Sequence, residues 1–364
     1  MKGSARNLRA VLCGYYGEHN LGDDALLQVL LAEMPSTWRP VVTANDQERV
    51  KQQHPQVSTV DRRSLLKTAQ AIVQSDALVL GGGSLLQDST SFKSLLYYLL
   101  LIGLARSLGR PVILWGQGLG PLMHPISRRL VRVVLPKVQA IGWRDADSLA
   151  LAERWNIRVP NVMAADPVWS YPQCSWQGTT CSDKQRRGVV VCWRPTTLLD
   201  SKGWKSLLRV VNVVAQQHTL PVTWLAFHQH QDQGLPNHLD QQDLMPNGLM
   251  ERSSFLVASS LKQVMDVFSC AQLVLPMRLH ALVLAQLSGA PCVAFSYDPK
   301  VSAAAAMAQA TCFELAALPR ESNMIEACTT QVNKPASLEA VAGLKADALR
   351  HGLLLREHLK VPAR

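Results

Sequence analysis

Short aliphatic runs alternate with longer helical patterns along almost the whole chain, and this alternation restricts the fold more than any other feature. Most of the runs end at a glycine, a proline or a polar residue, as strands do when a helix follows. In the first half the expected strands are Ala10–Cys13, Pro40–Thr43, Ala77–Leu80, Val112–Trp115, Ala140–Trp143 and Asn161–Ala164. In the second half they are Val189–Trp193, Val222–Phe227, Phe255–Ala258, Leu273–Leu275 and Cys292–Phe295. The pattern predicts an α/β fold whose parallel sheets are built from strand–helix–strand units.

The alternation stops between Tyr171 and Arg187, where a polar connector replaces it. Because 364 residues exceed the size at which one hydrophobic core stops growing, two domains are expected. We place an N-terminal α/β domain at residues 1–170, a linker at 171–187 and a C-terminal α/β domain at 188–364. The C-terminal domain is expected to end in an amphipathic helix over Ser337–Leu359. Two doubly wound domains would gather the carboxyl ends of their strands around a shared crevice, where such sheets bind ligands.

The chain carries a surplus of positive charge, with 37 Lys and Arg against 27 Asp and Glu. The surplus is spread along the chain without a run of like charges, so nucleic acid is not an expected partner. It favours small anionic substrates or the head groups of an acidic membrane, and a solvated basic surface explains it equally well. No apolar run approaches the roughly 20 residues that a membrane span needs. The eight cysteines lack metal-type spacing and read as reduced core residues, so a cytoplasmic protein is expected.

Glycine-rich segments follow three of the first-half strands. The first runs from Gly14 to Asp24 into a helix, and its spacing fits neither a dinucleotide fingerprint nor a Walker loop. Asp23 and Asp24 place negative charge where a phosphate would need positive potential, which favours a ligand with hydroxyls; either aspartate could instead be an N-cap. The other two segments are Gly81–Ser84 and Gly116–Pro121. They indicate either a flat floor for a bulky ligand or tight strand-to-helix turns.

Cationic side chains follow strands in both halves. Arg144 ends the fifth strand and suits a carboxylate or phosphate, with a salt bridge to Asp145 or Asp147 as the competing account. His228 and His230 could reach a metal, but no third ligand stands at metal spacing, so no metal is expected.

Arg278 and His280 lie between a strand and the next helix, where the helix N-terminus adds its own positive potential. An unpaired arginine in so apolar a stretch would be costly, which favours a ligand-binding role over a structural one.

The ordered set of these segments resembles the polysaccharide pyruvyl transferase family, in particular its bacterial cell-surface-anchoring branch. The resemblance extends from about Val11 to about Ala305. The matching pieces are Gly14-Tyr15-Tyr16-Gly17, Asn20-Leu21-Gly22-Asp23, Gly81-Gly82-Gly83, Gly116–Pro121, Arg144-Asp145, Asp166-Pro167, Arg278-Leu279-His280 and Tyr297-Asp298-Pro299-Lys300. The chain departs from the family pattern at Asp24, where Glu is usual, and at Trp143, where a small or aliphatic residue is commoner.

The resemblance implies a fold similar to B-type glycosyltransferases, with two Rossmann-like domains facing a cleft. It implies transfer of a pyruvyl group from phosphoenolpyruvate to two hydroxyls of one sugar in a cell-wall or surface polysaccharide precursor. The products are a cyclic ketal and phosphate, with no cofactor beyond the co-substrate. The glycan acceptor would be lipid-linked, with peripheral contact at the inner face of the membrane. Arg278, Leu279 and His280 would hold the donor, with Arg144 and Asp23 contributing from the first domain.

The residue types agree with this chemistry. Phosphoenolpyruvate carries a carboxylate and a phosphate, which call for two cationic anchors. His280 would protonate its methylene carbon, and Asp23 or Asp24 would take the proton of the attacking hydroxyl. The candidate acceptor or cleft residues are Gly14, Gly17, Asn20, Gly82, Gly83, Gln117, Arg194, His228, Asp298 and Lys300.

Two other functions fit the same fold. A nucleotide-sugar glycosyltransferase would need a carboxylate after the late strands to hold a ribose, and none is placed there. A non-catalytic glycan-binding or polyanion-binding protein would have little use for Arg278 and His280 beside a glycine-lined crevice.

Overall fold

The structure is a computed structural model that describes residues 8–172 and 187–360 of the chain. It divides into two compact units. Unit 1 contains the first strand up to Glu18, the stretch Asp23–Tyr171 and the residues from Lys345 onwards. Unit 2 contains His19–Gly22 and Pro172–Leu344. Most of the linker predicted at 171–187 lies outside the described residues.

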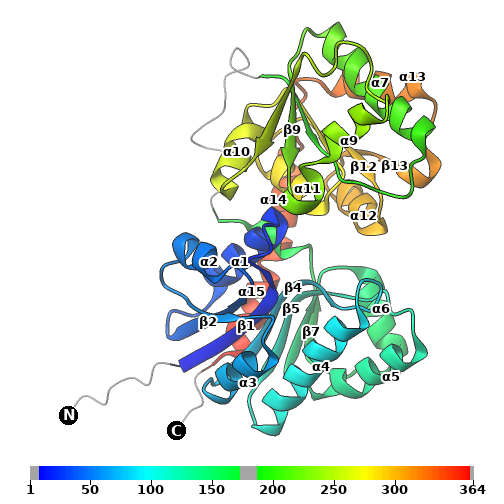
Figure 1. The fold of residues 1–364 in the computed structure, drawn as a ribbon. Helices are drawn as coiled ribbons and strands as arrows, with labels where there is room; N and C mark the ends of the chain where they lie inside the picture. The colour runs from blue at the N-terminus through cyan, green and yellow to red at the C-terminus, as the bar shows by residue number, and fades with distance from the viewer. Residues whose placement is uncertain (1–7, 173–186, 361–364) are drawn as a thin grey trace. The chain divides into compact units, whose positions relative to one another are not determined.

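The strands of unit 1 form one parallel sheet in the order β3-β2-β1-β4-β5-β6-β7 (Figure 1). They are β1 Leu8–Tyr16, β2 Trp38–Ala44, β3 Ser58–Asp61, β4 Ala77–Leu86, β5 Val112–Leu119, β6 Ala140–Trp143 and β7 Asn161–Met163. The helices are α1 Leu21–Glu33, α2 Gln47–Gln53, α3 Leu65–Val73, α4 Phe92–Ser107, α5 Pro125–Val134, α6 Ala146–Arg154 and α15 Arg350–His358, with 3-10 turns η1 Leu135–Lys137 and η2 Pro167–Ser170. This strand order is that of a doubly wound, Rossmann-like sheet.

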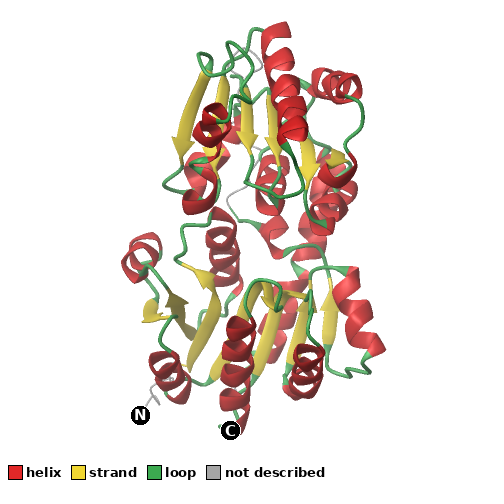
Figure 2. Ribbon diagram, turned by 45° about the vertical axis from the view of Figure 1, so that its right-hand side comes forward, coloured by secondary structure: helices red, strands yellow, loops and turns green. Residues whose placement is uncertain are grey.

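Helices cover both faces of the unit 1 sheet, because its strands are apolar on both sides. On one face, α3 to α6 pack on strand residues such as Val11, Leu78 and Leu114, all fully buried. On the other face, α15 contacts β5, β6 and β7, and the ring of His351 lies against β6 where Gly142 has no side chain. Figure 2 shows the strands as a layer between helices.

Unit 2 is a second parallel α/β unit with a four-stranded sheet in the order β10-β9-β8-β11 and a strand pair β12-β13. The strands are β8 Val189–Cys192, β9 Val222–Ala226, β10 Ser253–Val257, β11 Leu273–Pro276, β12 Val293–Ser296 and β13 Thr311–Glu314. The helices are α7 Ser201–Gln217, α8 Gln229–Asp232, α9 Leu235–Gln241, α10 Leu261–Ser269, α11 Leu279–Leu287, α12 Pro299–Met307, η4 Leu315–Ala317, α13 Glu321–Gln331 and α14 Leu338–Ala348. A parallel bridge between Val274 and Cys292 joins β11 to the residue before β12.

The C-terminal segment differs from the prediction of one helix within the second domain. It forms two helices, α14 and α15, and the residues from Lys345 onwards belong to unit 1. Trp38 Nε1 donates to the carbonyl of Leu359 at 2.8 Å, and the carboxylate of Asp347 accepts from the backbone N–H of Ala165 at 2.7 Å. These partners are far away in sequence, so the amphipathic pattern alone could not show which domain the segment would cover.

The strands β4 and β5 run further than predicted, because their glycine segments continue as irregular strand. Gly81, Gly82 and Gly83 lie inside β4, and Gly116 lies inside β5. Gly82, Gly83 and Gly116 have φ values of 77°, 82° and 58°, which favour glycine. The pairing of β4 with β5 shifts register just after Gly83. The expectation of tight turns at these positions is therefore wrong.

Candidate active site

Arg278 stands at the N-cap position of α11, directly after β11, and is held by Asp232 at the end of α8. Its Nε donates to Oδ2 of Asp232 at 2.7 Å and its Nη2 to Oδ1 at 2.5 Å. Nη2 also donates to Oε1 of Gln231 at 2.9 Å. The two charged side chains are only 10% and 1% exposed, so this is a buried, two-point ion pair. No acceptor for Nη1 is found in the described part of the chain, which leaves that end of the guanidinium for a ligand.

Asp232 is the main functional residue that sequence reasoning missed. It closes the run His228-Gln229-His230-Gln231-Asp232, in which only the histidines were considered as ligands. Besides holding Arg278, its Oδ2 accepts from the backbone N–H of His228 at 2.7 Å. An acid six residues after the end of β9 was the only available signal, because its partner lies 46 residues away.

His228 adjoins this ion pair and is 6% exposed. Its pKa is lowered first by burial and then by the positive charge of Arg278. The imidazole is therefore neutral at neutral pH and is poorly suited to act as an acid.

His280 lies in the first turn of α11, two residues after Arg278, and packs against Gly22. A β-carbon at Gly22 would overlap Nδ1 of the His280 ring, so only glycine leaves room for the histidine. The glycine that follows Asn20-Leu21 thus has a packing role beside a candidate catalytic side chain.

Backbone contacts hold the segment His19–Gly22 in unit 2. The N–H of Leu21 donates to the carbonyl of Phe227, and the N–H of Gln229 donates to the carbonyl of His19, both at 3.1 Å. Asn20 forms an antiparallel bridge with His228. Unit 2 therefore brings together four of the predicted site residues: Asn20, His228, Arg278 and His280.

Three other predicted residues of unit 2 make separate local contacts. Asp298 caps α12 by accepting from the backbone N–H of Lys300 at 3.1 Å, and it pairs with the Lys300 ammonium at 3.2 Å. The guanidinium of Arg194 lies 4.7 Å from the ring centre of Tyr297. Nothing among the described contacts links these three residues to Arg278.

In unit 1, Arg144 is buried at the end of β6 between an aspartate and a serine. Its Nη1 donates to Oδ2 of Asp166 at 3.1 Å and its Nη2 to Oγ of Ser84 at 3.0 Å. The competing account of a salt bridge to Asp145 or Asp147 is wrong, because Asp166 is the partner of Arg144 and Asp145 caps α6 by accepting from the N–H of Ser148 at 2.8 Å. The pairing of Arg144 with Asp166 could not be read from the spacing, because Asp166 lies 22 residues later, after the next strand.

Asp23 and Asp24 lie in different surroundings in the first turn of α1. Asp24 is 4% exposed and pairs with Arg49 at 3.1 Å. Burial raises its pKa to about 6 in spite of Arg49. Asp23 is half-buried and adjoins the segment that packs on His280. Asp24 is thus buried against Arg49, whereas Asp23 is the more exposed of the two carboxylates and is kept as the candidate base.

Two of the predicted cleft glycines have packing roles. The ring of Tyr16 occupies the space that a β-carbon of Gly14 would need, and its hydroxyl donates to the carbonyl of Gly81 at 2.6 Å. Gly17 has a φ of 70°, and the backbone of Asp46 lies 2.7 Å from its β-carbon position. Neither glycine is left open to a ligand.

Of the other predicted residues on β4 and β5, Gly82 and Gln117 have packing roles, whereas Gly83 borders open space. A β-carbon at Gly82 would press on Leu26, whereas one at Gly83 would meet nothing within 4 Å. Gln117 is fully buried, and its Nε2 donates to the carbonyls of Gly82 at 3.0 Å and Leu80 at 3.3 Å. Gln117 therefore ties β5 to β4, and Gly83 is the glycine that a ligand can approach.

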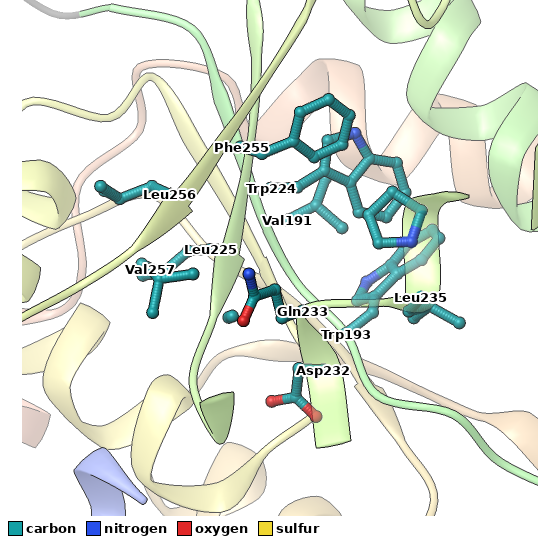
Figure 3. Close-up of a pocket in the computed structure, with 12 residues that line it drawn as sticks. Val191, Trp193, Trp224, Leu225, Asp232, Gln233, Leu235, Phe255, Leu256 and Val257 are labelled. Carbon is teal, nitrogen blue, oxygen red and sulfur yellow. The ribbon is translucent and has the colours of Figure 1, made fainter. Parts of the chain in front are cut away.

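A small pocket lies beside β9 and β10 in unit 2. Figure 3 shows Asp232 at its lower end, below the apolar side chains of Trp193, Leu235 and Phe255. An apolar wall next to a carboxylate does not suit a doubly anionic ligand, so we do not place the donor there. No cluster of three His, Cys, Asp or Glu side chains that could hold a metal occurs within residues 8–172 and 187–360.

A family model for polysaccharide pyruvyl transferases matches residues 20–299, which include both the Arg278 and the Arg144 sites. The chain belongs to the polysaccharide pyruvyl transferase family. No curated protein matches the sequence of this family member.

Solved structures similar to this transferase show the fold class. The UDP-GlcNAc 2-epimerase of Methanocaldococcus jannaschii has a TM-score of 0.65 at 12% identity, covering 96% of this chain and 99% of its own. The Neisseria meningitidis enzyme of the same name, bound to UDP-GlcNAc, has a TM-score of 0.60 at 14% identity, with 94% and 97% covered. Anabaena HepE in complex with UDP-glucose has a TM-score of 0.57 at 14% identity, with 96% and 98% covered. The predicted similarity to B-type glycosyltransferase folds is confirmed.

Proposed function

We propose that this family member transfers a pyruvyl group from phosphoenolpyruvate to two hydroxyls of one sugar in a surface polysaccharide precursor. Family membership supports a transferase that modifies polysaccharide. The donor, the ketal product and the sugar acceptor are part of our proposal. The observation that carries the proposal is the segment Arg278-Leu279-His280, placed where a fixed cation and the free N–H groups of α11 meet.

The donor is proposed to bind at the Nη1 end of Arg278. Asp232 fixes the guanidinium from its other side, so the cation is oriented before the ligand arrives. The N-terminal N–H groups of α11 would accept the second anionic group of phosphoenolpyruvate. Leu279, 8% exposed, would anchor the helix end in the core.

In the proposed reaction His280 gives its proton to the methylene carbon of the donor, which makes C2 electrophilic. A sugar hydroxyl adds to C2 while Asp23 takes its proton. Phosphate then leaves with its bonding electrons, and the second hydroxyl closes the ketal ring as its own proton is released. Each step uses residues of this chain alone.

The acceptor is proposed to be a lipid-linked glycan, approached by unit 1 through the open backbone at Gly83 and the Arg144–Asp166 pair beside it. Within residues 8–172 and 187–360, no helix has the length and apolar character needed to cross a bilayer.

Calorimetric titration with phosphoenolpyruvate and with UDP-glucose tests the donor assignment. We expect saturable binding of phosphoenolpyruvate, weakened in Asp232→Ala and unchanged in the control Arg209→Gln, whose side chain is 58% exposed. A second candidate, a nucleotide-sugar transferase, is favoured by the ligand of Anabaena HepE. Saturable binding of UDP-glucose without binding of phosphoenolpyruvate would replace the first proposal by the second.

A further inference from the structure

Exposed apolar side chains gather on the outer face of α4 and α5 in unit 1. They are Phe92, Leu100, Met123, Ile126 and Val133, with exposed fractions of 37%, 58%, 64%, 64% and 55%. The two helices pack side by side on the same face of the sheet (Figure 1). The Phe92 ring also packs edge-to-face on His124, which precedes α5, with ring centres 6.4 Å apart. These side chains together form what we call the α4–α5 face.

Three arginines stand among these apolar side chains. Arg128, Arg129 and Arg132 are exposed on α5, and no carboxylate within the described residues forms an ion pair with them. Their side chains line a groove together with Val133 and Trp155, and the groove contains no acidic residue. The α4–α5 face is therefore both apolar and strongly cationic.

The surplus of positive charge is unevenly distributed along the sequence, and the stretch that carries most of it includes α4 and α5. Residues 62–139 contain ten Lys and Arg but only two acids, Asp76 and Asp88, a net charge of +8 out of +10 for the chain. Asp88 is buried and accepts from the N–H groups of Met123 and His124 at 2.6 and 3.0 Å. Asp76 is occupied by the backbone N–H of Arg9 and by Arg110. The expectation of an evenly spread surplus is therefore wrong.

We infer that the α4–α5 face docks on a membrane surface that contains anionic lipid. Apolar side chains interleaved with arginines suit the boundary between acyl chains and anionic head groups, where each arginine keeps its charge at the head-group level. A second copy of the chain would bring the same positive charge onto the face and would be repelled. A nucleic acid would match the arginines but would leave Ile126 and Met123 without a role.

The location of the face gives docking a use. Phe92, Met123 and Ile126 lie at the N-terminal ends of α4 and α5, hence at the carboxyl edge of the parallel sheet, which also carries Gly83 and Arg144. A membrane-docked unit 1 would hold this edge close to a glycan attached to lipid. This use rests on the proposed function, whereas the binding itself does not.

Sedimentation with vesicles tests the inference on the full chain. The probe is phosphatidylcholine vesicles with and without about one third phosphatidylglycerol, at low and at physiological salt. We expect binding only to the anionic vesicles. Arg129→Gln with Arg132→Gln should lower the partition coefficient about 30-fold, and Ile126→Ser about tenfold.

Matched controls separate this face from general charge and apolarity. Lys202→Gln with Lys205→Gln removes two exposed positive charges from α7, and Leu353→Ser removes an apolar side chain that is 60% exposed on α15, on the other face of the sheet. Both controls should bind vesicles like the unchanged protein, and circular dichroism should show all variants folded.

Each contrary result has a defined meaning. Absence of binding to anionic vesicles at low salt overturns the inference, as does equal loss in the controls. Arginine variants that lose binding while Ile126→Ser keeps it would indicate a polyanion site, and a dimer that Ile126→Ser dissociates would indicate a contact between copies. Ile126→Ser should keep full transfer to a water-soluble oligosaccharide. If the unchanged protein binds vesicles but transfers no pyruvyl group to any acceptor, the proposed function is contradicted and the docking surface is still supported.

Discussion

Asp23 and Asp24 are neighbours in sequence, but their different surroundings assign them different roles. Asp23→Asn should lower turnover by about 10²–10⁴-fold with donor affinity preserved, because the attacking hydroxyl loses its base. Asp24→Asn should keep most of the turnover and lose stability, since Arg49 loses its partner. Steady-state kinetics, thermal unfolding and calorimetry with phosphoenolpyruvate distinguish the two variants. Full turnover in Asp23→Asn would remove Asp23 from the mechanism.

Arg278→Lys is not a conservative change at this position. An ammonium cannot make the two-point contact with Asp232, so a buried carboxylate loses half of its pairing. We expect a lower unfolding temperature as well as weaker binding of phosphoenolpyruvate, where the sequence alone predicts normal folding. The matched control is Arg209→Lys, at an exposed pair with Glu321, which should change stability by less than about 0.5 kcal/mol. Unchanged stability and unchanged donor affinity in Arg278→Lys would contradict the role given to the pair.

His280→Gln tests the proton donor. Glutamine keeps a hydrogen-bond donor but cannot supply a proton, so donor binding should survive while turnover falls by about 10²–10⁴-fold. A variant that loses donor affinity and keeps its maximal rate would make His280 an anchor for the phosphate. His228 would then be a weak alternative, because its lowered pKa keeps it neutral.

Sequence reasoning located Arg278 and His280 at a strand–helix junction, and the structure places them there. It could not find Asp232, and it matched Asp166 only as part of a motif, because a buried ion pair joins residues that only the fold brings together. It also gave Gly14 and Gly17 to the ligand, whereas Tyr16 and Asp46 occupy the space beside them. A glycine that serves packing and one that admits a ligand look alike in a sequence.

At the scale of elements, Glu33 at the end of α1 links three parts of unit 1. Its carboxylate accepts from Trp115 Nε1 of β5 at 3.1 Å and from Ser170 Oγ of η2 at 3.0 Å, and its carbonyl accepts from Arg356 of α15 at 3.3 Å. Burial raises its pKa to about 7, against hydrogen bonds from Ser170 and Trp115 that lower it.

This raised pKa gives a pH-dependent prediction for Glu33→Gln. Between about pH 4.5 and 7 the folded carboxyl keeps the proton that the unfolded one has released, so the wild-type free energy of unfolding falls as pH rises. The glutamine variant lacks this fall. Relative to wild type it should therefore gain stability across that window, on the order of 2 kcal/mol. Urea unfolding at pH 5 and pH 7 measures the difference, and a constant difference at both values would contradict the assignment.

Periodicity predicted the central strands of both sheets, whereas two short edge strands escaped it. The strand Ala140–Trp143 has the predicted bounds, because its apolar run is continuous and ends sharply. The strands Ser58–Asp61 and Thr311–Glu314 were missed, since each lies at an edge and has few apolar residues. Edge strands need less burial and therefore leave a weaker pattern.

At the scale of the whole molecule, two features escaped sequence reasoning because they depend on the three-dimensional arrangement. The C-terminal residues return to unit 1 through contacts with Trp38 and Ala165, more than 180 residues away. Exposed apolar side chains and three exposed arginines share the outer face of α4 and α5, although they are scattered along the sequence. Family membership and the fold class, by contrast, could be predicted from the order of short motifs along the chain.

The central claim is that the chain transfers a pyruvyl group from phosphoenolpyruvate to two hydroxyls of one sugar. The most direct measurement uses phosphoenolpyruvate labelled with carbon-13 at C2 and glycan acceptors from the source cell, in deuterated water. We predict one labelled ketal carbon bonded to two sugar oxygens, a methyl group that carries one deuterium from the solvent, and one inorganic phosphate released per ketal. Release of a nucleoside diphosphate from a nucleotide sugar, with no labelled carbon in the glycan, would contradict the claim.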